Sequence, residues 1–422
     1  MKWHSPRLSR LAQIIRGVSF DSSEASPTPI AGHVPILRAG NIGRDLDTEN
    51  DLIWVPAARV SDEQRLKAGD IAIAMSSGSS NIVGKTAQLN QAWDGSVGAF
   101  CAIIRPLETV SAAYLGYWLL GPTFTAWRQS QCMGLNIKNL RKAEIECLEI
   151  PLPPPSEQHR IVEILDQADA LRRKRAEADA KAGRILPALF YKMFGDPATN
   201  PKGWPVVPIS KLVEPIERRD PSVQPEEPFT YIDIASVNGQ LGVITDTKAL
   251  MGAEAPSRAR QIVRANDAII STVRPYLRAT ALVPTQHDNQ ICSTGFCVLR
   301  AKTGVGFGFL YALSRLQWFT DQLNARARGA SYPAVTDADV LNLRVPRQTD
   351  RETLQIFDRQ VLDVLVQQDK RRGVACRLGV LFETLLHRAF TGDLMAGWRE
   401  AHMNELQIEM ESQARMLKGG DE

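Results

Sequence analysis

The chain contains segments with two different hydrophobic periods. Short runs in which apolar and polar residues alternate, such as 33–42 and 229–244, are broken by glycine and proline and predict β-strands. Two longer segments, 155–196 and 348–394, instead place apolar residues at steps of three and four, the period of an amphipathic helix. The pattern therefore predicts β-rich regions separated by two long helices.

Each predicted helix is too long to be covered by one small domain. Nearly forty residues at about 1.5 Å each give roughly 55–60 Å, so the apolar stripe needs another long element, and the other helix is the obvious partner. The open alternative is packing of each helix on its own β-rich region. We expect Ser156 as N-cap and Gly195 as the end of the first helix. The expected coiled-coil and partner interface consists of Ile161, Ile164, Leu165, Ala168, Leu171, Phe357, Val361, Leu362 and Leu365.

An internal repeat organises the chain. Segment 134–153 is echoed by 329–348 at a shift of 195 residues, and 66–75 returns as 263–272 at a shift of 197. We therefore predict an α+β fold, a tandem duplication with pseudo-two-fold symmetry, in which two β-rich lobes are joined by two long antiparallel coiled-coil helices. The predicted domains are a first lobe at 1–154, a first helix at 155–196, a second lobe at 197–347, a second helix at 348–394, and an amphipathic tail at 395–422.

Composition limits the possible classes of protein. A chain of 422 residues exceeds one core, and 44% hydrophobic with 23% charged residues is ordinary for a globular protein. The net charge of +3 means that nucleic-acid binding would need local basic patches. The first residues contain no long apolar run, so no signal peptide or membrane span is expected. Six scattered cysteines without a CxxC spacing predict buried thiols, no zinc site and the reducing cytoplasm.

The stretch DIAIAMSSGSSNIVGKTAQL, at 70–89, resembles a phosphate-binding P-loop. A P-loop has four residues between its first glycine and its Gly-Lys pair, whereas Gly78 and Gly84 are separated by five. A helix should also begin at Lys85, but the residues that follow predict strand and turn. A nucleotide-binding enzyme that uses the 78–86 loop is therefore kept only as an alternative function.

Three other motifs fall short of an active site. The glycine-rich segment 303–313 follows a predicted strand, but its repeat counterpart lacks those glycines. Segment 152–156 has the paired prolines of an amino-methyltransferase motif, with Leu152 where a polar residue is required. Asp246 and Lys248 form half of a metal-nuclease motif without a second acidic partner. We predict no catalytic residue, no metal site and no cofactor in this chain.

Two segments resemble a known family. IPLPPPSEQHRIVEILDQADAL, at 150–171, is similar to the spacer entry of type I restriction-modification specificity subunits, and MFGDPATNPKGWPVVPISKLV, at 193–213, is similar to the join between their halves. The resemblance covers almost the whole chain, although 347–350 (RQTD) departs from the first copy. It implies a non-catalytic protein whose lobes are target recognition domains, each reading half of a split DNA sequence.

The resemblance also implies partners. The helices would carry two modification subunits that methylate adenine with S-adenosylmethionine, and restriction subunits, where present, would use ATP and Mg²⁺ to translocate and cleave double-stranded DNA. None of these cofactors would be bound by this chain. The remaining alternative is a coiled-coil scaffold whose lobes bind protein.

Candidate DNA contacts are polar residues in loops that correspond between the repeats. Lys and Arg suit phosphates, and Arg, Lys, Asn and Ser suit base edges. The loop after one first-lobe strand corresponds to 273–279, and the two differ in polar content. Ordinary solvated surface residues are the alternative for each position. The candidates are Arg38, Asn41, Ser76, Ser77, Ser79, Ser80, Asn81, Lys85, Asn136, Lys138, Asn139, Arg274, Tyr276, Arg278, Arg326, Arg328, Ser331 and Tyr332.

Overall fold

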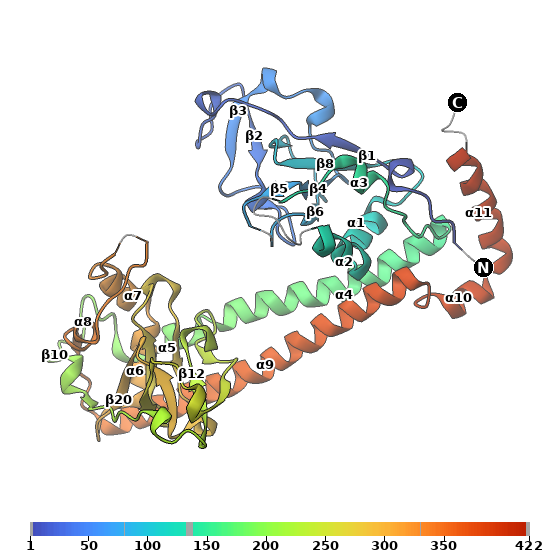
Figure 1. Cartoon of the computed structure of the whole chain (residues 1–422). Helices are drawn as coiled ribbons and strands as arrows, with labels where there is room; N and C mark the ends of the chain where they lie inside the picture. Colours follow the sequence, from blue (N-terminus) through green and yellow to red (C-terminus); the bar gives the residue numbers. More distant parts are fainter. Residues whose placement is uncertain (1–2, 80, 132–137, 330, 419–422) are drawn as a thin grey trace. The chain divides into compact units, whose positions relative to one another are not determined.

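The computed structural model describes residues 3–79, 81–131, 138–329 and 331–418. It is a mixed helix and sheet (α+β) structure whose chain divides into two compact units (Figure 1). Unit 1 comprises residues 1–174 and 376–422, and unit 2 comprises residues 175–375. Each unit therefore contains a β-rich lobe together with segments of both long helices.

Unit 1 is built on two sheets. The first is antiparallel, in the order β1 (Ala12–Arg16), β8 (Cys101–Pro106), β4 (Ile71–Ala74) and β6 (Thr86–Gln88). The second has the order β3 (Ile53–Pro56), β2 (His33–Leu37) and β7 (Ser96–Val97). A short ladder joins β5 (Ser76–Ser77) to β9 (Lys138–Asn139).

Unit 2 has a first sheet in the same strand order and a second sheet with one strand more than that of unit 1. Its first sheet is β11 (Val213–Glu214), β20 (Phe296–Ala301), β17 (Ala268–Ser271) and β18 (Thr280–Leu282). Its second is β15 (Lys248–Met251), β12 (Pro228–Ile232), β19 (Gln290–Ser293) and β16 (Ala259–Val263). Two small ladders pair β10 (Val206–Pro208) with β21 (Arg344–Pro346) and β13 (Val237–Asn238) with β14 (Val243–Ile244). The repeated segments 66–75 and 263–272 thus supply β4 and β17, adjacent to the longest strand of each first sheet.

The same buried ion pair supports both first sheets. In unit 1 Arg105 donates to Asp70 through Nε at 2.9 Å and Nη2 at 2.7 Å, and Asp70 is 2% exposed. In unit 2 Arg300 donates to Asp267 through Nε at 3.1 Å and Nη2 at 2.9 Å. Each carboxylate also accepts a backbone N–H three residues earlier, so its charge is fully paired despite its burial.

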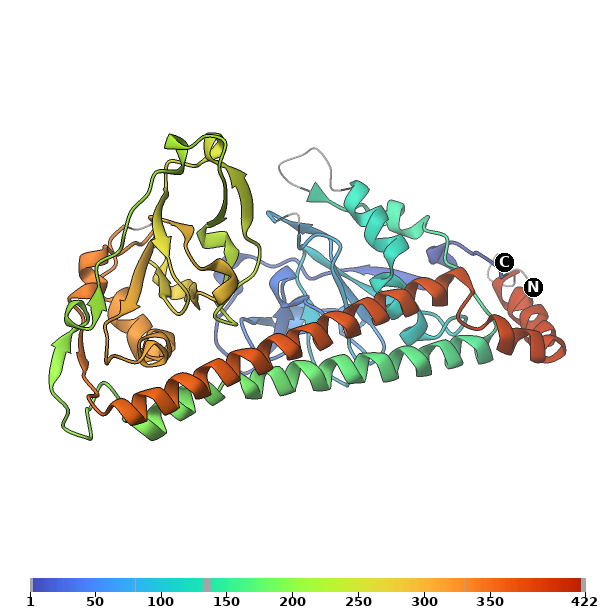
Figure 2. The same cartoon turned by 90° about the horizontal axis from the view of Figure 1, so that it is seen from below.

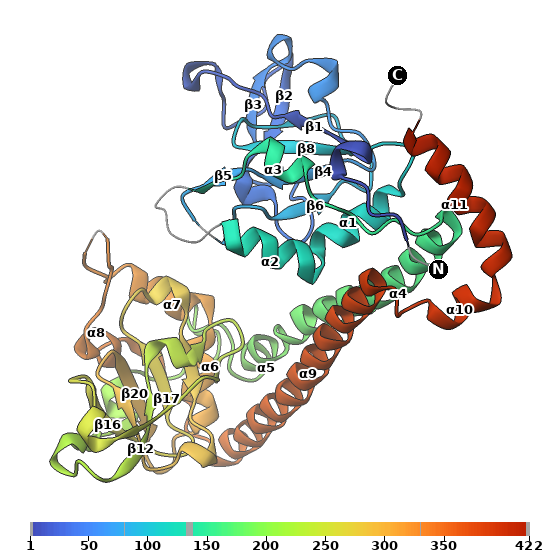
Figure 3. The same cartoon turned by 45° about the vertical axis from the view of Figure 1, so that its right-hand side comes forward.

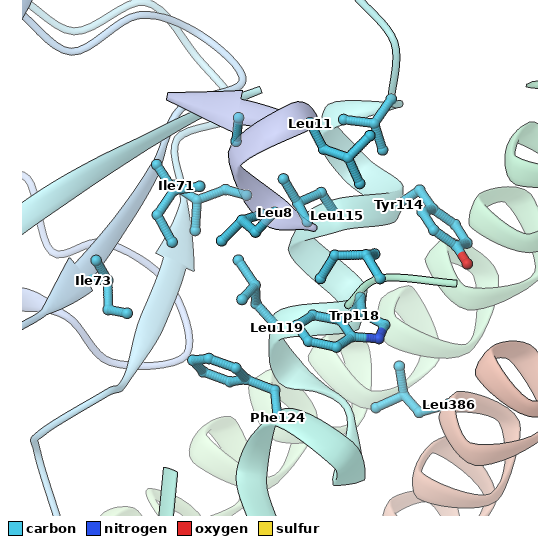
Figure 4. Close-up of a cluster of buried hydrophobic side chains, with 14 of the residues drawn as sticks. Leu8, Leu11, Ile71, Ile73, Tyr114, Leu115, Trp118, Leu119, Phe124 and Leu386 are labelled. Atoms are coloured by element: carbon cyan, nitrogen blue, oxygen red, sulfur yellow. The ribbon is translucent and has the colours of Figure 1, made fainter. Parts of the chain in front are cut away.

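Short helices complete each lobe. Unit 1 contains α1 (Ala112–Leu120), α2 (Pro122–Gln131) and α3 (Lys142–Glu146), and unit 2 contains α6 (Phe307–Arg315), α7 (Gln317–Asn324) and α8 (Asp337–Leu341). Figure 4 shows how α1 joins the lobe to a long helix in unit 1: Leu115 and Leu119 lie toward the sheet, and Trp118 lies near Leu386. The hydrophobic core of unit 1 is therefore continuous from the sheet to the helix pair.

The long helices are α4 (Pro155–Ala182), α5 (Ile185–Phe194) and α9 (Arg351–Thr391). The expectation of one unbroken first helix was wrong, because a turn at residues 183 and 184 separates α4 from α5, although Arg184 keeps right-handed helical dihedrals. Pro187 has no N–H to donate to the carbonyl of Gly183 and its ring crowds that carbonyl, which explains the break. Gly195 does end α5, with φ of 81°.

Helix segments pack against each other within each unit. In unit 1 Ile161, Leu165 and Ala168 of α4 are buried in one cluster with Phe382 and Leu386 of α9, and the two segments run side by side (Figure 2). In unit 2 Phe194 of α5 contacts Phe357 of α9, with ring centroids 4.7 Å apart, and both rings are buried with Val361. Ile164 and Leu365 are partly buried at the edges of these clusters.

Two expected seam residues lie elsewhere. Leu171 is 54% exposed and Leu362 is 40% exposed. The buried positions 161, 165 and 168 continue at 172, one residue after Leu171, and the guanidinium of Arg172 covers the Phe382 ring at 4.2 Å. Leu362 likewise follows the buried Val361 by one residue, so both leucines are out of phase with the stripe.

The C-terminal tail forms two helices, α10 (Ala396–Ala401) and α11 (Met403–Lys418), which pack in unit 1 near the start of α4 (Figure 3). Arg399 donates to the fully buried Glu157 through Nε at 3.0 Å and Nη2 at 2.6 Å. Ser156 is not the N-cap, because α4 already begins at Pro155; its N–H and hydroxyl both donate to Glu409. The tail therefore supplies a carboxylate to the N-terminus of α4, where backbone donors are otherwise free.

Among the described residues, no helix combines the length and the apolar character that a bilayer crossing requires.

The cysteines differ in their exposure. Burial raises the pKa of the Cys101 thiol to about 12, whereas Cys147 and Cys376 are exposed, so the expectation of buried thiols was wrong for these two.

Candidate nucleic-acid interface

In unit 1 two of the predicted DNA-contacting segments come together. The chain leaves β4 at Ala74 and forms β5, in which Ser76 pairs with Asn139 and Ser77 pairs with Lys138 of β9. Ser79, Asn81 and Asn139 are exposed. Ser80 and Asn136 lie outside the described residues, and for Lys138 the structure describes the backbone only. The strand exit and the segment before α3 therefore form one polar edge of the lobe.

Lys85 lies at the far end of this loop, directly before β6. Thr86 begins β6, so the strand predicted after Lys85 is confirmed, and the helix that a P-loop places there does not form. Gly84 has φ of 73°, and a Cβ there would lie 2.5 Å from Cγ and Cδ of Arg128. The stem of Arg128 on α2 thus lies beside Lys85, a neighbouring cation that sequence inspection missed because α2 has no motif.

Unit 2 brings together the corresponding segments. Val273 forms an antiparallel bridge with Ala334, and the Arg274 N–H donates to the carbonyl of Pro333 at 2.7 Å. The guanidinium of Arg274 lies over the ring of Tyr332, 4.5 Å from its centroid. Tyr332 is 69% exposed, so this stacked pair lies at the surface of unit 2.

The loop that carries Arg274 is tightly held at its other end. Residues Pro275–Leu277 form a 3₁₀ turn between Arg274 and Arg278, and both arginines adopt left-handed backbone conformations with φ of 49° and 52°. The guanidinium of Arg278 donates to the carbonyl of Arg315 and, at 3.3 Å, to Oε1 of Gln317. Arg278 therefore anchors the loop within unit 2, and its predicted contact with DNA stays a prediction.

Tyr276 and its neighbour are presented outward by this anchored turn. Tyr276 is 51% exposed and Leu277 is 53% exposed. Leu277 was not predicted, since an apolar residue inside a polar loop gives no signal for nucleic-acid contact. The turn thus presents two apolar side chains next to the Arg274–Tyr332 pair.

The second-lobe segment 326–332 adds more charge. Arg326 is exposed and donates to the carbonyl of Gln322 at 2.6 Å, while Ser331 is exposed without secondary structure. Arg328 approaches Asp339 at 3.6 Å but remains largely exposed. An exposed ion pair contributes little to stability, so Arg328 can exchange this partner for a phosphate at small cost.

Arg38 and Asn41 do not belong to these loops. Asn41 is 4% exposed; its side chain accepts the Arg38 N–H at 2.8 Å and donates to the carbonyls of Asp47 and Asn50. It therefore shapes a loop of unit 1, and the expectation of a DNA contact was wrong. Arg38 forms an ion pair with Asp51 at 2.6 Å.

The glycine-rich segment before α6 is not a phosphate-binding loop. The carboxylate of Asp358 accepts the backbone N–H of Gly308 at 2.8 Å, which occupies the helix N-terminus with the chain's own anion. Burial raises the pKa of Asp358 to about 6, opposed by the backbone hydrogen bonds from Gly308 and Phe307. In the described part of the chain, no group of three or more His, Cys, Asp or Glu is arranged to hold a metal ion.

Comparison with known proteins shows what the first part of the chain is similar to. Residues 2–178 match the family model of the type I restriction modification DNA specificity domain. A 164-residue segment is 33% identical to the type I restriction enzyme EcoKI specificity subunit of Escherichia coli (strain K12) and 34% identical to the StySPI specificity subunit of Salmonella potsdam. The segment is 39% of this chain and 35% of either relative, so the match spans about a third of their length.

The fold of nearly the whole chain has a solved counterpart. The S subunit of a type I restriction-modification system from M. genitalium aligns over 92% of this chain and 96% of its own, with a TM-score of 0.52 and 13% identity, a likeness of fold alone. Residues 2–178 are thus similar to the DNA specificity domain of type I restriction-modification systems.

Proposed function

We propose that this protein is the DNA-recognition subunit of a type I restriction-modification complex and reads a split site, with one half-site for each lobe. One observation carries the proposal. The first sheets of the two lobes have the same strand order, and at the same point after β4 and β17 each lobe has a loop paired with the segment before its last short helix. Unit 1 presents serine, asparagine and lysine there, whereas unit 2 presents arginine and tyrosine.

Divergent chemistry on a common framework is what two readers of different sequences require. Hydroxyl and amide groups accept and donate to several base edges, while arginine prefers the two acceptors of guanine. The exposed cations Arg326 and Arg328 suit phosphates, which position a protein without selecting a sequence. The two half-sites should therefore differ.

The long helices would dock two modification subunits. Exposed apolar side chains on helix surfaces support this part of the proposal, since such residues favour a protein partner over water. They lie on α4 and α9 and are Leu171, Leu362, Val366, Val380 and Leu381. The helices would also fix the distance between half-sites through the antiparallel, pseudo-two-fold arrangement that the repeat predicts. S-adenosylmethionine, ATP and Mg²⁺ would bind the partner subunits, which would carry out the chemistry on cytoplasmic DNA.

The proposal is tested with the assembled complex. Co-expression with the modification subunits of the same system, followed by methylome sequencing of the host, should reveal an adenine-methylated sequence with two specified halves and an unspecified middle. Binding of that duplex should weaken steeply as salt increases, because phosphate contacts release counterions. Salt-insensitive association with protein and no methylated motif would favour the scaffold alternative, and ATP hydrolysis by the isolated chain would favour the nucleotide-binding one.

A further inference from the structure

The Arg274–Tyr332 pair has features that an ordinary surface arginine lacks. Arg274 has a left-handed backbone with φ of 49°, which is uncommon for a residue other than glycine. Its Nε is buried and has no hydrogen-bond partner in the described ranges of the chain. Strained, unpaired polar groups of this kind occur where function requires a fixed side chain.

The surrounding contacts hold this arginine in place. The Arg274 N–H donates to the carbonyl of Pro333 at 2.7 Å, and the N–H of Val335 donates to the carbonyl of Thr272 at 2.8 Å, so residues 272–274 are bonded to the segment that directly follows Tyr332. Pro275 is buried, and Arg278 anchors the other end of the turn to Arg315. The guanidinium is therefore presented by backbone that is fixed at both ends.

Stacking on Tyr332 and burial of Nε together determine which hydrogen-bond donors of Arg274 remain available. The ring of Tyr332 covers one face of the planar guanidinium, and burial of Nε removes that edge from solvent. The remaining end of the group carries Nη1 and Nη2, two parallel donors in the plane of the guanidinium. Two donors at this spacing match O6 and N7 of guanine in the major groove, the commonest arginine contact to a base.

We propose that Arg274, stacked on Tyr332, is a specificity-determining residue that reads a guanine in the half-site recognised by unit 2. The inference rests on the proposed function and adds the base to it. Unit 1 has Ser76 and Ser77 at the corresponding place, where they form a two-stranded ladder with Asn139 and Lys138. The half-site read by unit 1 therefore does not depend on an arginine at this position.

The first test compares methylated motifs. Arg274→Gln should relax one G·C position in one half-site, with a loss of preference of roughly 5- to 150-fold, and leave the other half unchanged. Arg274→Lys should do the same, because lysine keeps the charge but lacks two parallel donors. The unchanged half-site also reports that the variant folds. Arg264→Gln is the matched control, since its guanidinium is already paired with Glu217 at 3.1 Å.

The stacking partner is tested separately. Tyr332→Phe keeps the ring and should preserve the motif, whereas Tyr332→Leu should relax the same G·C position as Arg274→Gln, to a smaller extent. Equal relaxation by both variants would show that the hydroxyl, and not the aromatic face, is required, and an unchanged motif in both would show that the ring is not required; either result contradicts the stacking arrangement.

The decisive experiment replaces the proposed guanine with 7-deazaguanine, which removes only the N7 acceptor. Duplex methylation by the wild-type complex should fall, and the Arg274→Gln complex should show no further fall, because the two changes remove one contact. Additive losses, or a motif unchanged by Arg274→Gln, would overturn the guanine contact while leaving the proposed function intact. A wild-type complex that methylates no split sequence would instead overturn the proposed function.

Discussion

The two lobes agree where they are buried and differ where they are exposed. Asp70 with Arg105 and Asp267 with Arg300 form the same charged pair beneath the first sheet of each unit. A few residues beyond β4 and β17, the loops share no chemistry: Ser76 and Ser77 lie in a short ladder, whereas Arg274 lies over an exposed tyrosine ring. The comparison separates residues that maintain the lobe from exposed loop residues, which the proposed function makes the selectors of a DNA sequence.

This separation has a physical basis. A buried charge that loses its partner is costly, so the framework pair tolerates little change. Exposed loop residues contribute little to stability, and substitutions there usually alter the free energy of unfolding by less than about 0.5 kcal/mol. One framework can therefore carry loops of different chemistry without loss of its fold.

The largest expected effect concerns the tail that belongs to unit 1. Arg399→Ala leaves Glu157 buried without its cation, which should lower the stability of unit 1 by about 3–5 kcal/mol. Hydrogen exchange followed by mass spectrometry measures each unit separately and should show unit 2 unaffected. Arg415→Ala, an exposed change on the same tail, is the control. Equal protection of unit 1 in both variants would argue against a structural role for the tail.

The framework pairs should behave alike in both units. Arg105→Ala and Arg300→Ala each strand a buried carboxylate, so each should destabilise its own unit by about 3 kcal/mol. Urea titration monitored by exchange in each unit provides the measurement. A clear loss in one unit and none in the other would break the correspondence between the lobes.

Sequence patterns predicted where the long helices and the repeated strands lie better than they predicted the break in the first helix or the residues of the seam. The three- and four-residue period located α4 and α9, and the repeat aligned the strands that became β4 and β17. The break after Ala182 follows from Pro187, whose effect depends on the carbonyl four residues earlier and does not alter the apolar pattern. Leu171 was assigned to the seam because it is apolar, but the seam position is filled by Arg172, whose stem and guanidinium cover Phe382.

The candidate site shows a similar limit. Loop polarity identified the segments that meet in each lobe, since hydroxyl, amide and guanidinium groups are visible in the sequence. It could not distinguish Arg274 from Arg278, because their different partners come from α7 and from the segment around Tyr332. Asn41 was misassigned for the same reason: an asparagine that bonds its own loop has the same sequence signature as one that reads a base.

A pH experiment sharpens the comparison at the helix junctions. In unit 1 the neutral side chain of Gln158 accepts the Ser111 N–H before α1, whereas in unit 2 the carboxylate of Asp358 accepts the Gly308 N–H in α6. Burial raises the pKa of Asp358 from 3.8 to about 6, so the folded unit favours the protonated carboxyl. The stability of unit 2 that depends on this protonation is therefore fully present below about pH 4 and is lost as the pH rises through 6.

The variant Asp358→Asn removes this titration. It should stabilise unit 2 at pH 7 by on the order of 1 kcal/mol, a value reduced for the partial solvent exposure of the carboxyl, and the gain should disappear near pH 4. The measurement is the free energy of unfolding of each unit from pH 4 to 8. Unit 1 serves as the comparison, because Gln158 holds the equivalent position and does not titrate in this range. A variant that is less stable than the wild type at pH 7 would contradict the sign.

The smallest effect on stability is expected in the reading loop of unit 1. Ser76→Ala combined with Ser77→Ala should change the stability of unit 1 by less than about 0.5 kcal/mol, because both residues are only half-buried. The same variant should alter the half-site read by unit 1 in the methylome. A destabilised unit with unchanged sequence selection would place these serines in the framework instead.

The most direct test of the central claim exchanges a whole lobe. Residues 1–154 would be replaced by the corresponding lobe of another type I specificity subunit, and the methylome of a host with the assembled complex would be sequenced. We expect one half-site to change completely while the other half and the gap between them stay the same. If both half-sites changed, or if neither did, the account of two independent reading lobes would be contradicted.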